Sequence, residues 1–287
     1  MIAFANFLLF TGLTIAIGAV TLRYLLLTRS GLAVTERAPA ARHAAGGGAI
    51  GAALVLVAAF MRAAVQVNAF ADPGEPWLPV LRTILDTGLG RALQLQAIWS
   101  AAALMAFSVA RLGRQRGWSA AAIAMMICSL TPALGGHPAA QEQATLAMTA
   151  ATIHVLAAGA WIGGLFHLYR ASGAASELTL TRLLHAFHNV ALGAATALAF
   201  TGLYHVWTML PAPAALWTSA WGRLLVTKLL VLGGVLWLGY RHWKGSEQSV
   251  AKGDRAGLRT SLARELGLAL VVLVLTGVLT SVSPPEM

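Results

Sequence analysis

The sequence has a single cysteine, Cys128, among its 287 residues. One thiol excludes a disulfide within the chain and a zinc site built from several thiolates. Charge is scarce as well, because Asp, Glu, Lys and Arg together make up 10% of the residues, against roughly 25% in a soluble domain. With 58% hydrophobic residues, the chain has too few polar groups to cover a surface in water. The composition therefore excludes an ordinary soluble globule and predicts a membrane protein.

Apolar runs of membrane-spanning length recur along the whole chain. A helix needs about 20 apolar residues to cross the hydrocarbon core, and lipid leaves helices as the only structure open to such runs. Eight runs qualify, at roughly 4–28, 46–70, 90–110, 118–134, 143–169, 183–210, 221–240 and 262–281. The connections between them are too short for a soluble domain. The sequence predicts an all-α, polytopic fold of eight transmembrane helices in one integral membrane domain, residues 1–287.

The net charge of +10 is distributed unevenly over the connections. The connections between runs 1–2, 3–4, 5–6 and 7–8 carry most of the Lys and Arg, whereas the opposite side has only Arg82 and Arg91. Cytoplasmic loops carry this excess, so we expect both termini in the periplasm. No basic residue precedes the first run, and the first one in the chain is Arg23 near the end of that run, so we expect no cleaved signal peptide. The positive charge therefore indicates how the chain is oriented in the membrane and predicts attraction to anionic lipid. We expect no nucleic-acid partner.

The two halves of the chain, residues 1–140 and 141–287, resemble each other weakly. The pattern Ile-Gly-x5-Tyr begins at Ile17 in the first run and recurs at Ile162 in the fifth. Four helices per half would make the repeats parallel, related by an axis along the membrane normal. Chance similarity between segments rich in Ala, Leu and Gly is the alternative, and both interpretations remain open.

Histidines within or beside the apolar runs are the main functional candidates, because ionisable groups in hydrocarbon are costly. His154 lies about 13 Å into the fifth run at 1.5 Å per residue. His137 follows the fourth run, and His205 lies near the end of the sixth on the same side of the membrane, with Met209 one helical turn further on. Imidazole and thioether suit copper, especially Cu(I), and only Glu142 offers a carboxylate nearby. We therefore predict a copper ion held by His137, His154, His205 and Met209.

Each of these residues also has a structural interpretation. His154 and other buried histidines can simply hydrogen-bond a neighbouring helix, His137 can be a solvated loop residue, and Met209 can be a packing residue. At the inner side, His167, His185, His188 and His242 have two open interpretations: ordinary interfacial residues, which are common, and an exit site for the ion, since His185 and His188 are three residues apart and share a helix face. Lys228, deep in the seventh run, is expected to have a partner that the sequence does not identify.

A haem-binding electron-transfer protein is the alternative function, because transmembrane histidines also ligate b-type haem in cross-helix pairs. His154 and His167 are 13 residues apart, which places them about 140° apart around a helix at 100° per residue. They do not line one face, which disfavours two stacked haems. A single haem between His154 and His205 remains possible on this evidence.

Motifs from residue 131 onward, over the fourth to eighth runs, resemble the bacterial copper resistance protein D family (CopD/PcoD-like). They are TPALGGH at 131–137, IHVLAAGAWIGG at 153–164, TGL at 201–203, WGRLL at 221–225 followed by Lys228, and ELG at 265–267. Their order along the chain is the same as in the family. Two departures are that Phe187-His188 stands where the family often has Phe-Ser, and that the first run has no histidine.

The resemblance implies an inner-membrane protein, not an enzyme, that moves copper between periplasm and cytoplasm, with uptake as the expected direction. It also implies a small periplasmic copper-binding protein of the CopC type as partner. Among the candidate ligands it supports mainly His137 and His154. Because the chain has no nucleotide-binding motif, we expect no ATP-driven pump.

Overall fold

The computed structural model describes residues 1–173, 176–251 and 255–285, with the backbone alone over 242–251. Within these ranges every element is helical and none is a strand. Among the described residues, eight helices are long and apolar enough to cross a membrane: Ile2–Arg29, Val34–Phe70, Gly88–Arg111, Gln115–Leu134, Ala144–Ala171, Glu177–Met209, Ala220–Arg241 and Arg255–Leu279. The predicted all-α class and the predicted eight spans are thereby confirmed.

Two of the spans consist of more than one element. The first comprises α1 (Ile2–Thr21), a π-helical turn η1 (Leu22–Leu26) and α2 (Leu27–Arg29), and the fifth comprises α7 (Ala144–Ala158), the π-helical turn η3 (Gly159–Gly163) and α8 (Gly164–Ala171). The other spans are α3 (Val34–Phe70), α5 (Gly88–Arg111), α6 (Gln115–Leu134), α9 (Glu177–Met209), α11 (Ala220–Ala251) and α12 (Arg255–Leu279). Short helices α4 (Trp77–Leu85), η2 (His137–Ala140) and α10 (Ala215–Thr218) lie in the connections.

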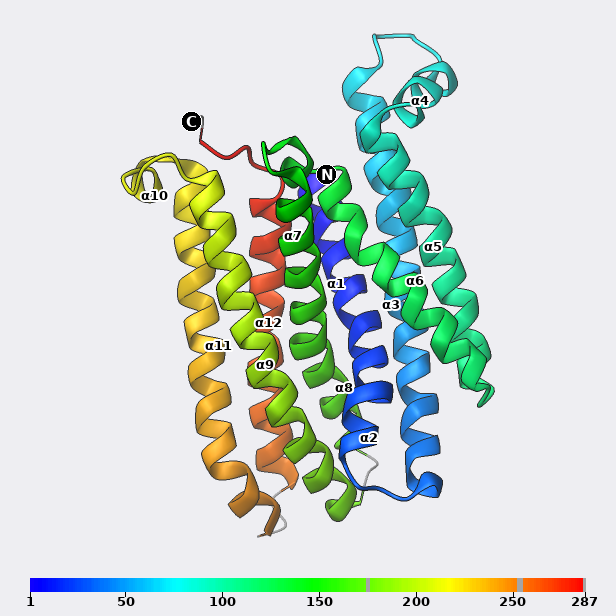
Figure 1. The fold of residues 1–287 in the computed structure, drawn as a ribbon, viewed down its shortest axis with the longest axis vertical. Coiled ribbons are helices and arrows are strands. Elements are labelled where there is room, and N and C mark those ends of the chain that lie inside the picture. The colour runs from blue at the N-terminus through cyan, green and yellow to red at the C-terminus, as the bar shows by residue number, and fades with distance from the viewer. Residues whose placement is uncertain (174–175, 252–254, 286–287) are drawn as a thin grey trace.

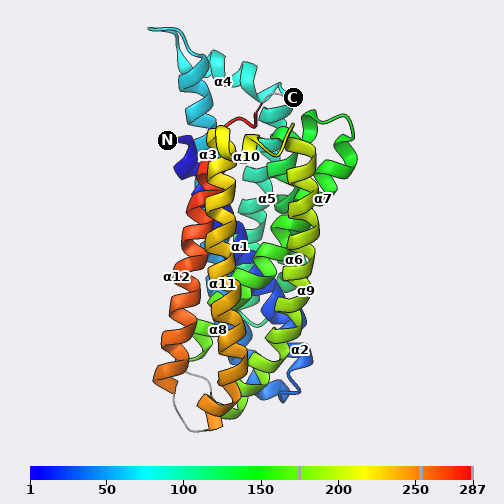
Figure 2. The same cartoon turned by 90° about the vertical axis from the view of Figure 1, so that its left-hand side faces the viewer.

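The spanning helices lie side by side in one bundle, with the N- and C-termini at the same end (Figures 1 and 2). Helix α3 begins well before the apolar run and ends with it, and its end rises with α4 above the rest of the bundle (Figure 1). It begins at Val34, where the Glu36 carboxylate accepts a hydrogen bond from the Ala33 amide of the preceding turn. Hydropathy marks only the membrane-crossing part of a helix, so the run at 46–70 underestimates its length.

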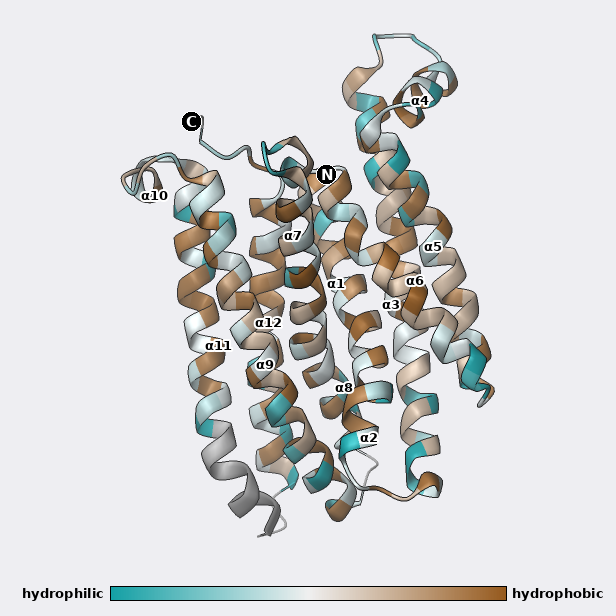
Figure 3. Ribbon diagram, viewed as in Figure 1, coloured by the Kyte–Doolittle hydropathy of each residue, from teal (hydrophilic) through white to brown (hydrophobic). Residues whose placement is uncertain are grey.

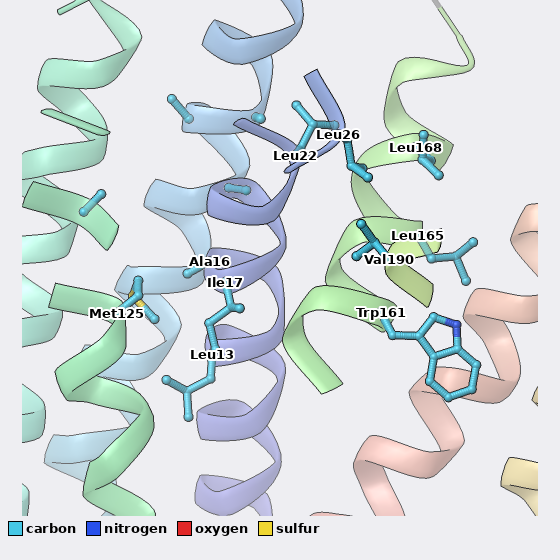
Figure 4. Close-up of a cluster of buried hydrophobic side chains, with 14 of the residues drawn as sticks. Leu13, Ala16, Ile17, Leu22, Leu26, Met125, Trp161, Leu165, Leu168 and Val190 are labelled. Carbon is cyan, nitrogen blue, oxygen red and sulfur yellow. The ribbon is translucent and has the colours of Figure 1, made fainter. Parts of the chain in front are cut away.

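Hydrophobic residues predominate along the middle of the helices, and hydrophilic residues are more frequent near the ends of the bundle (Figure 3). Several large apolar side chains point outward, among them Phe200, Trp207 and Leu230. Such exposed apolar surface is unfavourable in water and is the surface that lipid requires. Inside, Leu13 and Ile17 of α1 lie between Met125 on one side and Leu165 and its neighbours on the other (Figure 4).

Helix α1 joins the two halves of the bundle. It packs against α3 and α6 of its own half and against η3, α8 and α12 of the other. At the closest approach, a Cβ atom on Gly18 would overlap the backbone of Gly163, and a Cβ on Gly163 would overlap the carbonyl of Thr14. Glycine is required at both positions because the two backbones touch. At the end of the bundle that bears the termini, Asn6 Nδ2 donates to Oγ1 of Thr280, the residue that follows α12, at 3.1 Å.

Replacing Gly163 with leucine should disrupt the bundle, because the new side chain has no space at the α1 crossing. We expect Gly163→Leu to lower the free energy of unfolding by about 3 kcal/mol, the upper range for overpacking. Thermal unfolding of the detergent-purified protein, followed by circular dichroism, measures this. Gly193→Leu on α9 is the control, since a Cβ there would meet no other described part of the chain within 4 Å. Equal stability of the two variants would contradict the importance of this contact.

Candidate metal site

His154 of α7 and Thr201 of α9 contact each other inside the bundle. His154 is ten residues from the start of α7 at Ala144, so it lies about 15 Å along the helix. Its Nδ1 atom is 2.8 Å from Thr201 Oγ1, and Thr201 is buried. The contact joins two spans that are 47 residues apart in sequence. His154 is therefore held by a neighbouring helix at a depth where water is scarce.

The hydrogen bonds of Thr201 determine which nitrogen of His154 is free. Thr201 Oγ1 lies 2.7 Å from the carbonyl oxygen of Ala197. Two oxygens this close require a hydrogen between them, so the hydroxyl donates to Ala197 and accepts from His154 Nδ1–H. Nε2 of a neutral His154 then carries the lone pair. Histidines that bind metals usually donate their other ring N–H in this way, which fixes the tautomer and orients the ring.

His205 lies directly beside His154. The centroids of the two imidazole rings are 5.9 Å apart, with an interplanar angle of 70°. His205 Nδ1 is buried, and no described residue forms a hydrogen bond with it. A buried nitrogen without a partner is unusual in a folded protein and calls for a ligand. Because Thr201 and His205 are four residues apart, they share the face of α9 that packs on α7.

Lys228 of α11 adds a positive charge near the two imidazoles. It is close enough to interact electrostatically with both His154 and His205. Within the described ranges, neither a hydrogen bond nor an ion pair joins its ammonium group to another residue, so the expected partner is not found there. Because like charges repel more strongly at low dielectric, a charged Lys228 would weaken the binding of any cation between the two imidazoles.

The chemistry of this pair suits a soft cation with few ligands. In the part of the chain that the structure describes, no three His, Cys, Asp or Glu side chains are grouped closely enough to hold a metal ion. Structural zinc sites need four such ligands, and Mg²⁺ or Ca²⁺ need oxygen ligands. Imidazole is a good ligand for copper. Two neutral imidazoles with one free nitrogen each therefore fit a weakly held copper ion best.

The other two predicted ligands lie nearer the outer end of the bundle. His137 is exposed at the start of η2, and the turn that follows is attached to α9 by Gln141 Nε2, which donates to Thr208 Oγ1 at 3.3 Å. Met209 is partly buried against a cluster that contains Trp221, Leu225 and Leu279. Of the four predicted ligands, the structure thus brings together His154 and His205.

The inner histidines do not form one group. His167 is buried and its Nε2 lies 3.0 Å from the Ile15 carbonyl of α1, whereas His188 lines a different cavity together with Glu265 and Tyr240. His185 is exposed on α9, and the side chain of His242 lies outside the described residues. His154 contacts α9 and His167 contacts α1, in agreement with the prediction that they face different sides.

Comparison with known proteins shows what the chain is similar to. Residues 181–279, which include His205 and Lys228, match the family model of copper resistance protein D. The chain is also 27% identical over 232 residues to the copper transport protein CutJ of Bacillus subtilis (strain 168), an alignment that covers 77% of this chain and 42% of that relative. The chain thus spans less than half the length of this relative. No solved structure matches the chain. The two matches confirm that this multi-pass helical protein resembles the copper resistance protein D family.

Proposed function

We propose that this protein transports copper across the bacterial inner membrane, from periplasm to cytoplasm, in copper homeostasis and resistance, and that it is not an enzyme. The observation that carries the proposal is the pair His154 and His205, two imidazoles in contact inside a membrane-spanning bundle. Each offers a ring nitrogen without a protein partner among the described residues. The family match and the copper-transporting relative favour copper over haem as the ligand.

The route that we propose begins at the outer end of the bundle. A periplasmic copper-binding protein of the CopC type delivers the ion to His137, which is exposed in the turn before α7. The ion then passes inward to Nε2 of His154 and Nδ1 of His205. Met209, one helical turn outward from His205, supplies a thioether ligand for the ion on its way from His137 to the pair formed by His154 and His205. Proximity of these groups to the outer ends of α7 and α9 supports this order.

The orientation rests on charge and on the position of the chain ends. We place the end of the bundle that bears both termini in the periplasm, because the connections at the opposite end carry most of the Lys and Arg. We also propose that the halves are parallel repeats. The contact of Gly18 with Gly163 supports this, since it brings the two copies of the Ile-Gly-x5-Tyr pattern together at the centre of the molecule.

Binding at this site depends on the neutral form of both histidines. An imidazole must be deprotonated to coordinate a metal, so acidification weakens binding. Thr201 holds His154 in the tautomer that leaves Nε2 free. Lys228 opposes the positive charge of the cargo. A transported ion must leave as well as bind. This combination of neutral ligands and a nearby cation keeps the affinity of the site for copper moderate.

Removing either imidazole tests the proposed site directly. We expect His154→Ala and His205→Ala each to reduce Cu(I) affinity by more than the roughly 10- to 100-fold typical of losing a supporting residue. Anaerobic titration against a chromophoric Cu(I) chelator measures the affinity, and copper accumulation in cells measures transport. His185→Ala, an exposed histidine on α9, is the control. Unchanged binding and accumulation in both variants, or an intense Soret band at stoichiometric haem in the wild type, would refute the proposal.

The hydroxyl of Thr201 should matter for copper although it does not touch the ion. Thr201→Val keeps the shape of the side chain but removes the acceptor for His154 Nδ1–H, so Cu(I) affinity should fall about 10- to 100-fold. The matched control is Thr196→Val, because Thr196 also donates to a carbonyl of α9 but is exposed. Equal affinities of the two variants in the same titration would show that Thr201 does not orient a ligand.

A further inference from the structure

A cavity of about 340 Å³ opens at the end of the bundle opposite the termini. It lies where α3 and α9 begin and where α8 ends, which is the cytoplasmic end in the proposed orientation. The polar residues that line it are Glu36, His43, His167, Arg170, Ser176 and Thr179. The cavity is separate from the pair formed by His154 and His205, because His167 is 13 residues, or about 20 Å, further along the fifth span.

His167 lines this cavity and keeps one ring nitrogen available for a ligand. Its side chain is only 3% exposed, and its Nε2 lies 3.0 Å from the carbonyl oxygen of Ile15 in α1. A carbonyl only accepts hydrogen bonds, so Nε2 carries the hydrogen and a neutral ring keeps its lone pair on Nδ1. No side chain or backbone group within the described ranges hydrogen-bonds that atom. The arrangement resembles that of His154, in which one ring N–H likewise donates a hydrogen bond to a neighbouring helix.

Helix α3 brings a second imidazole to the same place. A Cβ on Gly47 would lie 2.6 Å from His167 Cε1 and 3.4 Å from its Nδ1, so this edge of the ring faces α3 where only glycine leaves room. His43 is one helical turn before Gly47, lines the same cavity and is close enough to interact electrostatically with His167. Unlike His167, His43 is exposed, so a ligand bound there has access to water.

We propose that His43 and His167 form a second copper site, from which the transported ion leaves toward the cytoplasm. The inference rests on the proposed copper transport and adds a site at the cytoplasmic end of the route. As at the outer pair, the two imidazoles have a basic neighbour: Arg170 lies beside His167 as Lys228 lies beside His154 and His205. Glu36 supplies one negative charge to the cavity. Both sites thus combine a pair of imidazoles with a cation that limits affinity.

Buried apolar side chains separate the two sites along the fifth span. Ile17 of α1 and Trp161 and Leu165 of η3 and α8 belong to one buried apolar cluster (Figure 4). These side chains offer an ion no polar ligand, so we expect the helices to move when the ion passes from one site to the other.

Counting bound copper in single variants tests the inner site. We expect the wild-type protein, carrying an affinity tag without histidine, to bind two Cu(I) ions in anaerobic titrations and His43→Ala to bind one. Because His43 is exposed, its loss does not threaten the fold. His167→Gln should also bind one, since the Gln amide can still donate to Ile15 while the imidazole nitrogen is lost. The control His185→Ala should bind two.

The same titrations separate this inference from the proposed outer site. His154→Ala should bind one ion, and the double variant His43→Ala with His154→Ala should bind none. If His43→Ala and His167→Gln keep the wild-type number of ions while His154→Ala loses one, the inner site is refuted and the outer site stands. If only His43→Ala and His167→Gln lose an ion, the inner site stands and the assignment of His154 is wrong.

Discussion

The contact between α1 and η3 determines how the rest of the bundle is arranged. At Gly18 and Gly163 the two backbones touch, so α1 lies deep between the halves and reaches α3, α6, α8 and α12 at once. From this crossing the fifth span runs in both directions, to His154 on one side and to His167 on the other. The positions of both histidines thus depend on one close approach that only glycine permits.

The same principle orients the imidazole on both sides of that crossing. His154 is held by Thr201 of α9 through Nδ1, and His167 by the Ile15 carbonyl of α1 through Nε2. In each case a hydrogen bond to a neighbouring helix uses the ring N–H, and the remaining nitrogen has a lone pair for a metal. Neutral ligands are also what lipid demands, because a buried carboxylate or thiolate would be costly without a bound cation. A soft, singly charged ion suits such a site.

Much of the fold could be predicted from the sequence, because the bilayer requires long apolar runs and the chain has eight. His154 and His205 could be identified as candidates because a polar residue stands out in an apolar segment, and the four-residue spacing from Thr201 to His205 indicates a shared face. Contacts between helices could not be predicted in this way. The periodicity of one helix does not say which neighbour it faces, so the positions of Thr201 relative to His154 and of Lys228 came only from the structure.

His43 was missed for a different reason. It follows Arg42 in a polar segment before the second apolar run, where a histidine is not costly and therefore gives no signal. The structure extends α3 back to Val34, and this extension places His43 in the cavity with His167. Conversely, the three-residue spacing of His185 and His188 predicts a shared helix face, but His185 is exposed and His188 lines a separate cavity. Burial at a helix end depends on tertiary packing, which the sequence alone does not report.

X-ray absorption at the copper edge would examine the ligands themselves. The sample is the His43→Ala protein loaded anaerobically with Cu(I), so that only the site between α7 and α9 is filled. We expect nitrogen ligands with the outer-shell scattering of imidazole rings, and a loss of part of that scattering when His205 is also replaced by alanine. A first shell made of sulfur alone, or one that is the same with and without His205, would contradict a copper site formed by His154 and His205.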